Sequence, residues 1–230
     1  MRDLRSHLSR LLARASSLRP REGARTLMFV SACNGEGTTS VAASFALLAA
    51  AQSPRMSWLV DLQVKQNSAY QGFQKRFASG VGVPGRPYDA SLGGEPPFSV
   101  KPHSAEQYVG EKLITAHQIE DTRLLVTRFR NERLHPGQEV SLNAEAAWWS
   151  TLKRSADWVI LNAPSLEASS VSLDLLKQTD SVVIVTRLDA SPASAVIPAC
   201  EQIELHGGVV LGVIANQVSS EARFFDRESR

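Results

Sequence analysis

The segment Ser31-Ala32-Cys33-Asn34-Gly35-Glu36-Gly37-Thr38-Thr39 decides which fold we expect for this chain. It lies between an apolar run at 26–30 and an alanine-rich run at 40–51. The first run is typical of a buried strand, and the second is typical of a helix without a breaker. A glycine-rich loop in this position can close its backbone N–H groups around phosphate at the positive end of the helix dipole. The segment predicts a strand, a loop of phosphate-binding ancestry and a helix; the alternative is a structural turn.

The loop lacks the lysine of an intact phosphate-binding loop. That lysine stands directly before the last Ser or Thr, where this chain has Thr38. Gly35 and Gly37 keep the curvature, and Thr39 keeps a hydroxyl that could ligate Mg²⁺. Phosphoryl transfer requires neutralisation of the charge on the γ-phosphate oxygens, so loss of the cation should lower both affinity and rate. We therefore expect slow or absent turnover.

Further apolar runs have the length and composition of strands. They cover 56–61, 123–127, 158–162, 181–186 and 209–215. A helix is predicted from about 143 to 154, with Trp148 and Trp149 serving packing. Strands separated by helical stretches predict a doubly wound, mainly parallel α/β sheet flanked by helices. Asp61 would lie at the carboxyl end of its strand, where such sheets bind ligands.

The length and composition allow one substantial core, since the chain has 230 residues of which 43% are hydrophobic. We expect one P-loop-like α/β domain over 26–220, followed by a tail at 221–230. Glycine and proline are frequent at about 79–103, which predicts an irregular surface insertion within the domain. The longest apolar run, 41–51, is too short to span a membrane.

Residues 1–25 predict a basic amphipathic helix, because they hold seven arginines against two acids. The apolar positions at helical spacing are Leu4, Leu8, Leu11, Leu12 and Ala15. Such a helix can lie on an anionic membrane surface or on the cytoplasmic end of a membrane protein. Equally, it can pack against its own domain with the arginines in water. We treat 1–25 as a candidate docking segment and leave both alternatives open.

The net charge and the cysteines indicate which kinds of partner, metal site and compartment to expect. The formal net charge of +2 is too small to predict nucleic-acid binding by the whole chain. Cys33 and Cys200 are the two cysteines, and without a CxxC pair or clustered histidines they predict neither a disulfide framework nor a zinc site. The basic amino terminus lacks the apolar core of a signal peptide. We expect a protein of the reducing cytoplasm.

These segments together resemble the cytoplasmic ATPase domain of bacterial tyrosine kinases. Those proteins are relatives of the MinD/ParA-type ATPases and work with chain-length-determinant membrane proteins in exopolysaccharide and capsule export. Residues 31–39 are similar to the family's S-A-x-P-G-E-G-K-S/T, with Asn34 in place of proline and Thr38 in place of lysine. Residues 41–46 are also similar to the family, and the resemblance covers most of 20–220.

Two acidic motifs of the family have counterparts that each lack one of the family's aspartates. Residues 61–67 resemble D-x-D-x-R-x-P and keep Asp61 and a basic residue, Lys65, but have Gln63 at the second aspartate. Residues 159–165 resemble a strand ending in I-I-D-x-P-P, with Asn162 at the aspartate. Asn162 carries no charge to support Mg²⁺ or its water.

A last motif concerns adenine. Residues 212–216 resemble G-V-I/V-x-N, whose asparagine contacts adenine in related ATPases, and here that position is Asn216. The alternative is a turn residue after a strand.

The resemblance implies a degenerate nucleotide site. Its candidate phosphate-binding residues are Asn34, Gly35, Glu36, Gly37, Thr38 and Thr39. ATP or ADP with Mg²⁺ would be the ligand, with Thr39 and Asp61 at the metal, unless the site binds no ligand. Three charged catalytic positions are replaced together, by Thr38, Gln63 and Asn162. The family's tyrosine-rich cluster is also missing from 219–230, so we expect neither tyrosine kinase activity nor catalysis.

Three functions remain to be weighed. The first is a pseudo-ATPase adaptor at the cytoplasmic side of the inner membrane, docked on a chain-length-determinant-type protein and able to form homo-oligomers. The second is a slow ATPase or kinase in which Lys65, or an arginine from 1–25 or from a neighbouring subunit, replaces the missing lysine. The third, a ParA-like protein on DNA, is disfavoured because no broad basic patch is evident outside the amino terminus.

Overall fold

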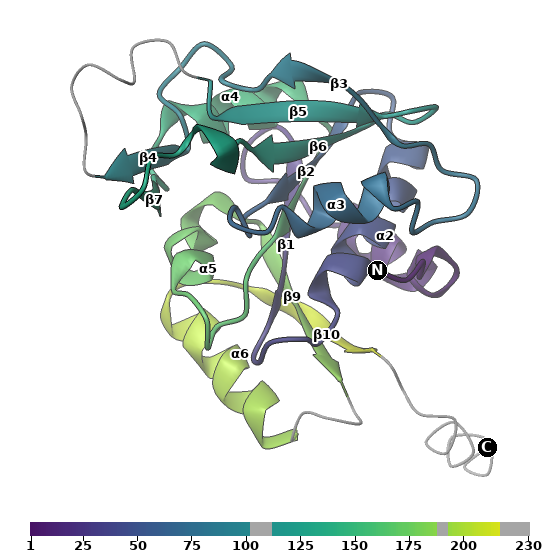
Figure 1. The fold of residues 1–230 in the computed structure, drawn as a ribbon. Coiled ribbons are helices and arrows are strands. Elements are labelled where there is room, and N and C mark those ends of the chain that lie inside the picture. The colour runs from purple at the N-terminus through teal and green to yellow at the C-terminus, as the bar shows by residue number, and fades with distance from the viewer. Residues whose placement is uncertain (102–111, 188–192, 217–230) are drawn as a thin grey trace, which may run out of the picture.

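The structure, a computed structural model, describes residues 1–101, 112–187 and 193–216. Its centre is an eight-stranded sheet with the order β10-β9-β1-β8-β2-β6-β5-β3 (Figure 1). The strands are β1 Arg25–Ser31, β2 Ser57–Asp61, β3 Pro84–Asp89, β5 Ile114–Ile119, β6 Leu124–Phe129, β8 Trp158–Asn162, β9 Ser181–Arg187 and β10 Val210–Asn216. The run from β10 to β6 is parallel, and β5 and β3 extend it in antiparallel pairing. The prediction of a mainly parallel α/β sheet is confirmed.

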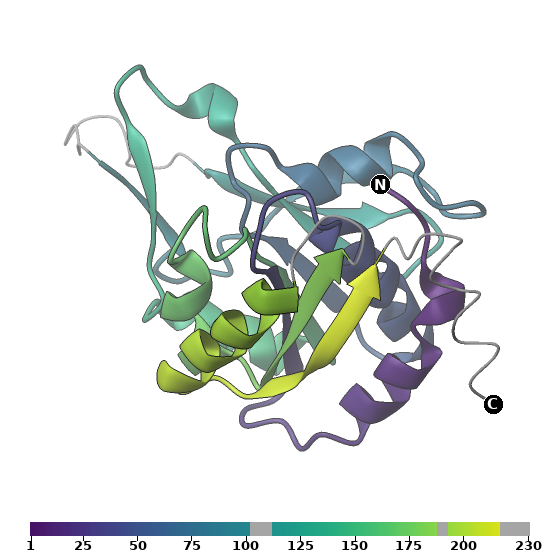
Figure 2. The same ribbon diagram turned by 90° about the horizontal axis from the view of Figure 1, so that it is seen from below.

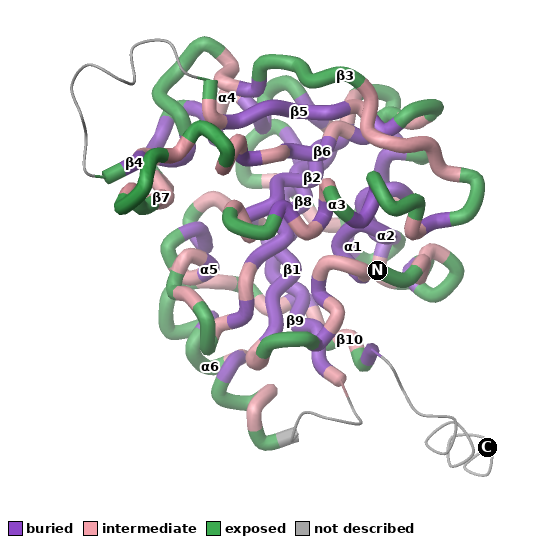
Figure 3. Tube along the Cα trace, viewed as in Figure 1, coloured by how far each residue is buried: buried purple, intermediate pink, exposed green. Residues whose placement is uncertain are grey.

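Helices cover both faces of the sheet, as expected for a doubly wound fold. The α-helices are α1 Ser9–Ser16, α2 Thr38–Gln52, α3 Ser68–Gln74, α4 Ala147–Ser155, α5 Val171–Asp174 and α6 Val196–Leu205. The short 3₁₀ helices are η1 Arg5–His7, η2 Asn131–Arg133, η3 Leu176–Gln178 and η4 Ala193–Ala195. The apolar side chains of α1, α2 and α3 join one core on one face of the sheet, and those of α4 and α6 join a second core on the other face. Figure 3 shows the central strands buried between these layers.

The amino-terminal helix packs against its own domain. Leu8, Leu12 and Ala15 are buried in the core that α2 and the sheet form, whereas Arg10 and Arg14 are exposed. Backbone N–H groups further fix this segment to α2, because those of Arg2 and Leu4 donate to serine hydroxyls of α2. Figure 2 shows the segment running along the outside of this layer. The apolar face of α1 is therefore occupied, and what remains for docking is the arginine face.

The insertion at 79–103 is more regular than its composition suggested. It contains β3, which forms the edge of the main sheet, and β4 Phe98–Lys101, which pairs with β7 Glu139–Leu142 in a small second sheet. Prolines are compatible with β3 because this edge strand pairs with β5 alone. Ala90 accepts a hydrogen bond of 2.6 Å from the indole of Trp148. The prediction of an irregular surface insertion is wrong for these parts.

Other boundaries differ by a few residues. The helix predicted from 143 begins at Ala147, and the antiparallel strand β5 was not predicted. Trp148 and Trp149 are fully buried, which confirms their packing role. The tail at 221–230 lies outside the described residues. None of the described helices is long and apolar enough to cross a bilayer.

Candidate functional site

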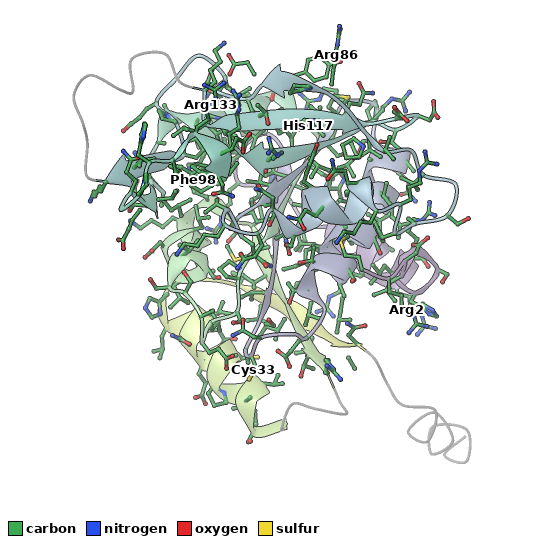
Figure 4. All side chains as sticks on the ribbon, viewed as in Figure 1. Arg2, Cys33, Arg86, Phe98, His117 and Arg133 are labelled. Carbon is green, nitrogen blue, oxygen red and sulfur yellow. The ribbon has the colours of Figure 1, made fainter. Side chains whose placement is uncertain are left out.

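A cavity of about 600 Å³ opens where the parallel strands end. The glycine loop that follows β1, the segment after β2 and the segment after β8 line it. These strands are neighbours, because β8 pairs with β1 on one side and with β2 on the other. In Figure 4 Cys33 marks the loop at the end of β1, and His117 lies on β5 in another part of the sheet. The predicted site residues therefore meet at the position where such sheets bind ligands.

The backbone of the glycine loop is shaped for an anion. Gly35 and Gly37 have positive φ angles of 79° and 85°, which residues with a side chain rarely adopt. Within the described part of the chain, no protein acceptor is recorded for the backbone N–H groups from Gly35 to Thr39. Successive free N–H groups at a helix start attract anions. The loop thus presents backbone N–H groups in the manner expected of a phosphate-binding loop.

Glu36 holds the loop in place. Its carboxylate accepts hydrogen bonds from the N–H of Cys33 at 3.1 Å, from the hydroxyl of Thr186 at 3.2 Å and from the N–H of Arg187 at 3.3 Å. The side chain is buried, with 1% of the residue exposed. Because these partners lie at the loop start and at the end of β9, Glu36 is a structural brace in the free protein.

Asn34 joins the loop to the segment after β8. Its amide Nδ2 and its backbone N–H donate to one carboxylate oxygen of Glu167, at 2.7 and 3.0 Å, and its Oδ1 accepts from the hydroxyl of Ser165 at 2.9 Å. Burial, with the charge of Glu167 next in size, raises the pKa of the Cys33 thiol. The start of the loop therefore faces a carboxylate, which weakens its attraction for anions.

Asp61 and Asn162 lie side by side on adjacent parallel strands. The two residues are paired positions at the ends of β2 and β8, and the Nδ2 of Asn162 donates to the Oδ1 of Asp61 at 2.9 Å. The backbone N–H groups of Gln63 and Ala69 also donate to the Asp61 carboxylate. Burial raises the pKa of Asp61 to about 6, and these hydrogen bonds oppose the rise.

The Asp61 contact fixes which way the Asn162 amide points. Rotating the amide would place its Oδ1 against the carboxylate, and two acceptors repel while Asp61 is ionised. Nδ2 therefore faces Asp61, and from there it also lies 3.2 Å from the hydroxyl of Thr39 and 3.3 Å from that of Ser68. Asn162 is fully buried, and its Oδ1 has no hydrogen-bond partner in the described chain.

The hydroxyl of Thr39 is surrounded by nitrogen donors. Nε2 of Gln63 lies 3.3 Å from it, in addition to Nδ2 of Asn162, and the Ser68 hydroxyl is 3.2 Å away. Mg²⁺ takes oxygen ligands in near-octahedral geometry, and an amide N–H cannot serve as one. Among the described residues, no group of three or more His, Cys, Asp or Glu is arranged to hold a metal ion. The residues at Thr39 and Asp61 therefore do not fit the Mg²⁺ ion that the resemblance implies.

Thr38 stands at the position of the missing lysine, and Lys65 is a predicted substitute cation. Thr38 lines the cavity but is nearly buried, with 6% of the residue exposed. Lys65 lines the same cavity and is exposed, and it is the one Lys or Arg among the described lining residues. No arginine of 1–25 lines this cavity in the described chain. Of the predicted substitute cations within the chain, the structure brings only Lys65 to the site.

Asn216 is buried, and its side chain fixes the loop. Its Nδ2 donates to the backbone carbonyl of Glu36 at 2.8 Å. Through this bond, the end of β10 holds the glycine loop from behind. The adenine contact stays a prediction, because nothing in the free protein tests it.

Sequence reasoning missed several contributors to the site. They are Ser68, Ser165, Glu167 and Thr186. Ser165 ends the 159–165 motif but was given no role there, whereas the other three are common polar residues outside the motif positions, and a neighbouring strand or loop brings each to the site. Ser68 had the best available signal, since it begins the helix that follows the Asp61 motif.

No protein-family model and no curated protein sequence matches the chain. Solved structures do match. The BceF tyrosine kinase domain aligns with a TM-score of 0.61 and 15% identity, over 94% of this chain and 76% of that one. The MinC:MinD cell division complex of Aquifex aeolicus aligns with 0.51 and 15%, over 90% and 73%. A nucleotide-binding protein of Archaeoglobus fulgidus in complex with ADP aligns with 0.51 and 13%, over 99% and 84%.

The fold is that of the P-loop NTPases. Identities this low establish the architecture alone, so what those proteins bind or catalyse is not thereby a property of this chain. Within the shared architecture, the glycine loop after β1 is the phosphate-binding position. Its chemistry in this chain follows from the residues described above.

Proposed function

We propose that this chain is a degenerate relative of the bacterial tyrosine kinase ATPases that acts as an adaptor or regulator and transfers no phosphoryl group. The observation that carries the proposal is the amide of Asn162, which stands between Asp61 and Thr39. A carboxylate at this position would support a metal ion and its water, whereas an amide N–H group carries no negative charge and cannot ligate the ion. The metal-dependent part of the chemistry thus has no place to occur.

The loss of the lysine supports the same proposal. Transition-state charge on a transferring phosphoryl group is stabilised by cations held in fixed geometry, and each such contact contributes about 3 kcal/mol or more. Thr38 offers a short neutral hydroxyl, and Lys65 is an exposed side chain on a different segment. With the cation and two acids replaced, we expect no turnover that matters to a cell.

The proposed setting is the cytoplasmic face of the inner membrane, in the synthesis or export of a bacterial exopolysaccharide. The proposed partner is a chain-length-determinant-type membrane protein, and self-association is part of the same proposal. Arg10 and Arg14 support it, because they project from α1 while the apolar residues of that helix pack inward. An arginine face of this kind suits an acidic cytoplasmic segment of a partner, or anionic lipid beside it.

Gene deletion with complementation tests this proposal. We expect deletion to change the amount or chain length of the surface polysaccharide, measured by gel filtration of purified polymer, and the wild-type gene to restore it. The double variant Arg10→Glu/Arg14→Glu should fail to restore it. The control variant Lys75→Glu/Lys101→Glu makes the same charge change at exposed positions on other elements and should restore it. A deletion that leaves the polysaccharide unchanged would sink the proposal.

The second candidate function is a slow ATPase that uses Lys65 as the substitute cation, and the place of Lys65 beside the cavity favours it. Magnesium-dependent phosphate release by the purified protein, lost in Lys65→Ala and kept in Lys75→Ala, would establish it. Lys75 is an exposed lysine that does not line the cavity. Equal release by wild type and Lys65→Ala, at the level of buffer, would remove this candidate.

A further inference from the structure

The cavity combines a surviving anion site with a displaced metal site. The loop from Gly35 to Thr39 presents N–H groups that no protein acceptor within the described chain takes up. Behind it, the hydroxyl of Thr39 lies among amide nitrogens. These two features differ in origin, because the first belongs to the backbone and the second to replaced side chains. Loss of the metal therefore does not require loss of phosphate binding.

Gln63 differs from Asn162 in what it presents to a ligand. Asn162 is fully buried and lies behind the cavity, whereas Gln63 is half-buried and lines it. The amide Nε2 of Gln63 carries two hydrogens, and one contact is recorded for it, to Thr39 at 3.3 Å. The second hydrogen is thus available to an acceptor in the cavity.

We propose that the cavity binds a diphosphate group without magnesium, with Gln63 donating to the phosphate where the metal ion of an intact site would stand. The loop N–H groups and Lys65 supply the rest of the positive potential. The cavity volume of about 600 Å³ lies within the range typical of nucleotide-sized ligands. This inference deepens the proposed function, since it rests on the loss of metal-dependent chemistry and names the ligand that such a regulator would sense.

The charge balance favours a diphosphate over a triphosphate. The carboxylate of Glu167 is bound at the loop start, and Asp61 lies behind Thr39. In an intact site, magnesium and lysine offset the additional charge of a triphosphate. Here Lys65 is the one basic side chain among the described lining residues, so the extra negative charge lacks a partner.

Calorimetry on the full chain tests the inference, with ADP, ATP and inorganic pyrophosphate each titrated in Mg²⁺ and in EDTA. We expect the dissociation constant of ADP to differ less than about twofold between Mg²⁺ and EDTA. In EDTA, we expect ATP to bind about tenfold more weakly than ADP. Gln63→Glu should weaken ADP binding about tenfold in EDTA, the effect of one hydrogen bond to a charged group. Gln71→Glu makes the same change on the exposed side of α3, outside the cavity, and should leave binding unchanged.

Pyrophosphate separates the two sources of the diphosphate. Binding of ADP but not of pyrophosphate supports a nucleotide ligand, and equal binding supports the inference with a free diphosphate as the ligand. A tenfold gain in ADP affinity on adding Mg²⁺ would overturn the inference, as would no binding of any of the three compounds by a protein whose thermal unfolding is cooperative. Either of those results leaves the deletion experiment intact, so the adaptor function and the ligand can fail separately.

Discussion

At the scale of single residues, the site is organised by Asp61, the acid that this chain has in common with the D-x-D-x-R-x-P motif it resembles. Its carboxylate is buried and satisfied by three N–H donors, from Gln63, Ala69 and Asn162. An acid with this many donors holds the segments around it in place. Its titration should therefore report on stability rather than on catalysis.

The pH dependence of stability should carry the signature of Asp61. Burial raises its pKa in the folded protein to about 6, above the usual 3.8 of an aspartate, so its contribution to stability is present below about pH 4 and is lost as the pH rises through 6. Two pKa units correspond to roughly 3 kcal/mol. Urea unfolding of wild type and Asp61→Asn between pH 4 and 7 measures this difference. A gap between the two proteins that does not change with pH would contradict the prediction.

Asn162→Asp should destabilise the free protein. The substitution replaces the Nδ2 donor to Asp61 by a second carboxylate in a fully buried position, where two like charges cannot both ionise. We expect a loss of about 2–3 kcal/mol in the free energy of unfolding at pH 7, and less at pH 5. Asn143→Asp is the control, because Asn143 also donates from its Nδ2 to a carboxylate, that of Glu95, but in an exposed contact where the same substitution should cost clearly less. Equal stability of wild type and Asn162→Asp would show that the Asn162 contact is not made.

At the scale of elements, the strands beside the loop were predictable, whereas the antiparallel strands β5 and β3 at one edge of the sheet were not. β1, β2, β8 and β9 are buried on both faces, so each reads as a continuous apolar run, which is a strong signal. β3 is an exposed edge strand that contains prolines, and its composition is that of a loop. Its place is set by pairing with β5, a contact between distant segments that local sequence does not encode.

The same distinction applies to α1. The spacing of its leucines predicted an amphipathic helix but did not say what its apolar face contacts. The position of that face depends on the apolar side chains of α2 and the sheet, against which Leu8 and Leu12 pack. The arginine face remained exposed as a consequence of this packing.

Leu12→Ala tests the packing of α1 directly. Leu12 has 3% of its surface exposed, so its truncation should lower the free energy of unfolding by about 2–4 kcal/mol. Leu11 is a half-buried neighbour on the same helix, and Leu11→Ala should cost clearly less. Chemical denaturation of both variants provides the measurement. Substitutions at surface positions usually change stability by less than about 0.5 kcal/mol. If the stabilities of the two variants differed by no more than this, the helix would not be docked in this way.

At the scale of the whole molecule, the chain has a P-loop NTPase-like architecture, and we propose that it does not carry out the phosphoryl chemistry usual for that architecture. The sheet order, the loop and the carboxyl-end cavity are those of a P-loop fold. The sequence alone predicted this architecture. It also predicted one site for Thr39, Asp61, Gln63 and Asn162, and these residues do meet, because their motifs follow neighbouring strands. What it could not predict was the amide orientation, which follows from a hydrogen bond between β2 and β8.

The central claim is that amide donors exclude a metal ion from Thr39. Manganese is a paramagnetic substitute for magnesium in oxygen-ligand sites, so water-proton relaxation measures it directly. We would titrate the full chain into Mn²⁺ and ATP. The account predicts that the protein leaves the relaxation rate of the Mn–ATP solution unchanged. An enhancement with wild type that disappears in Thr39→Ala would contradict it, because it would place the metal ion at the Thr39 hydroxyl.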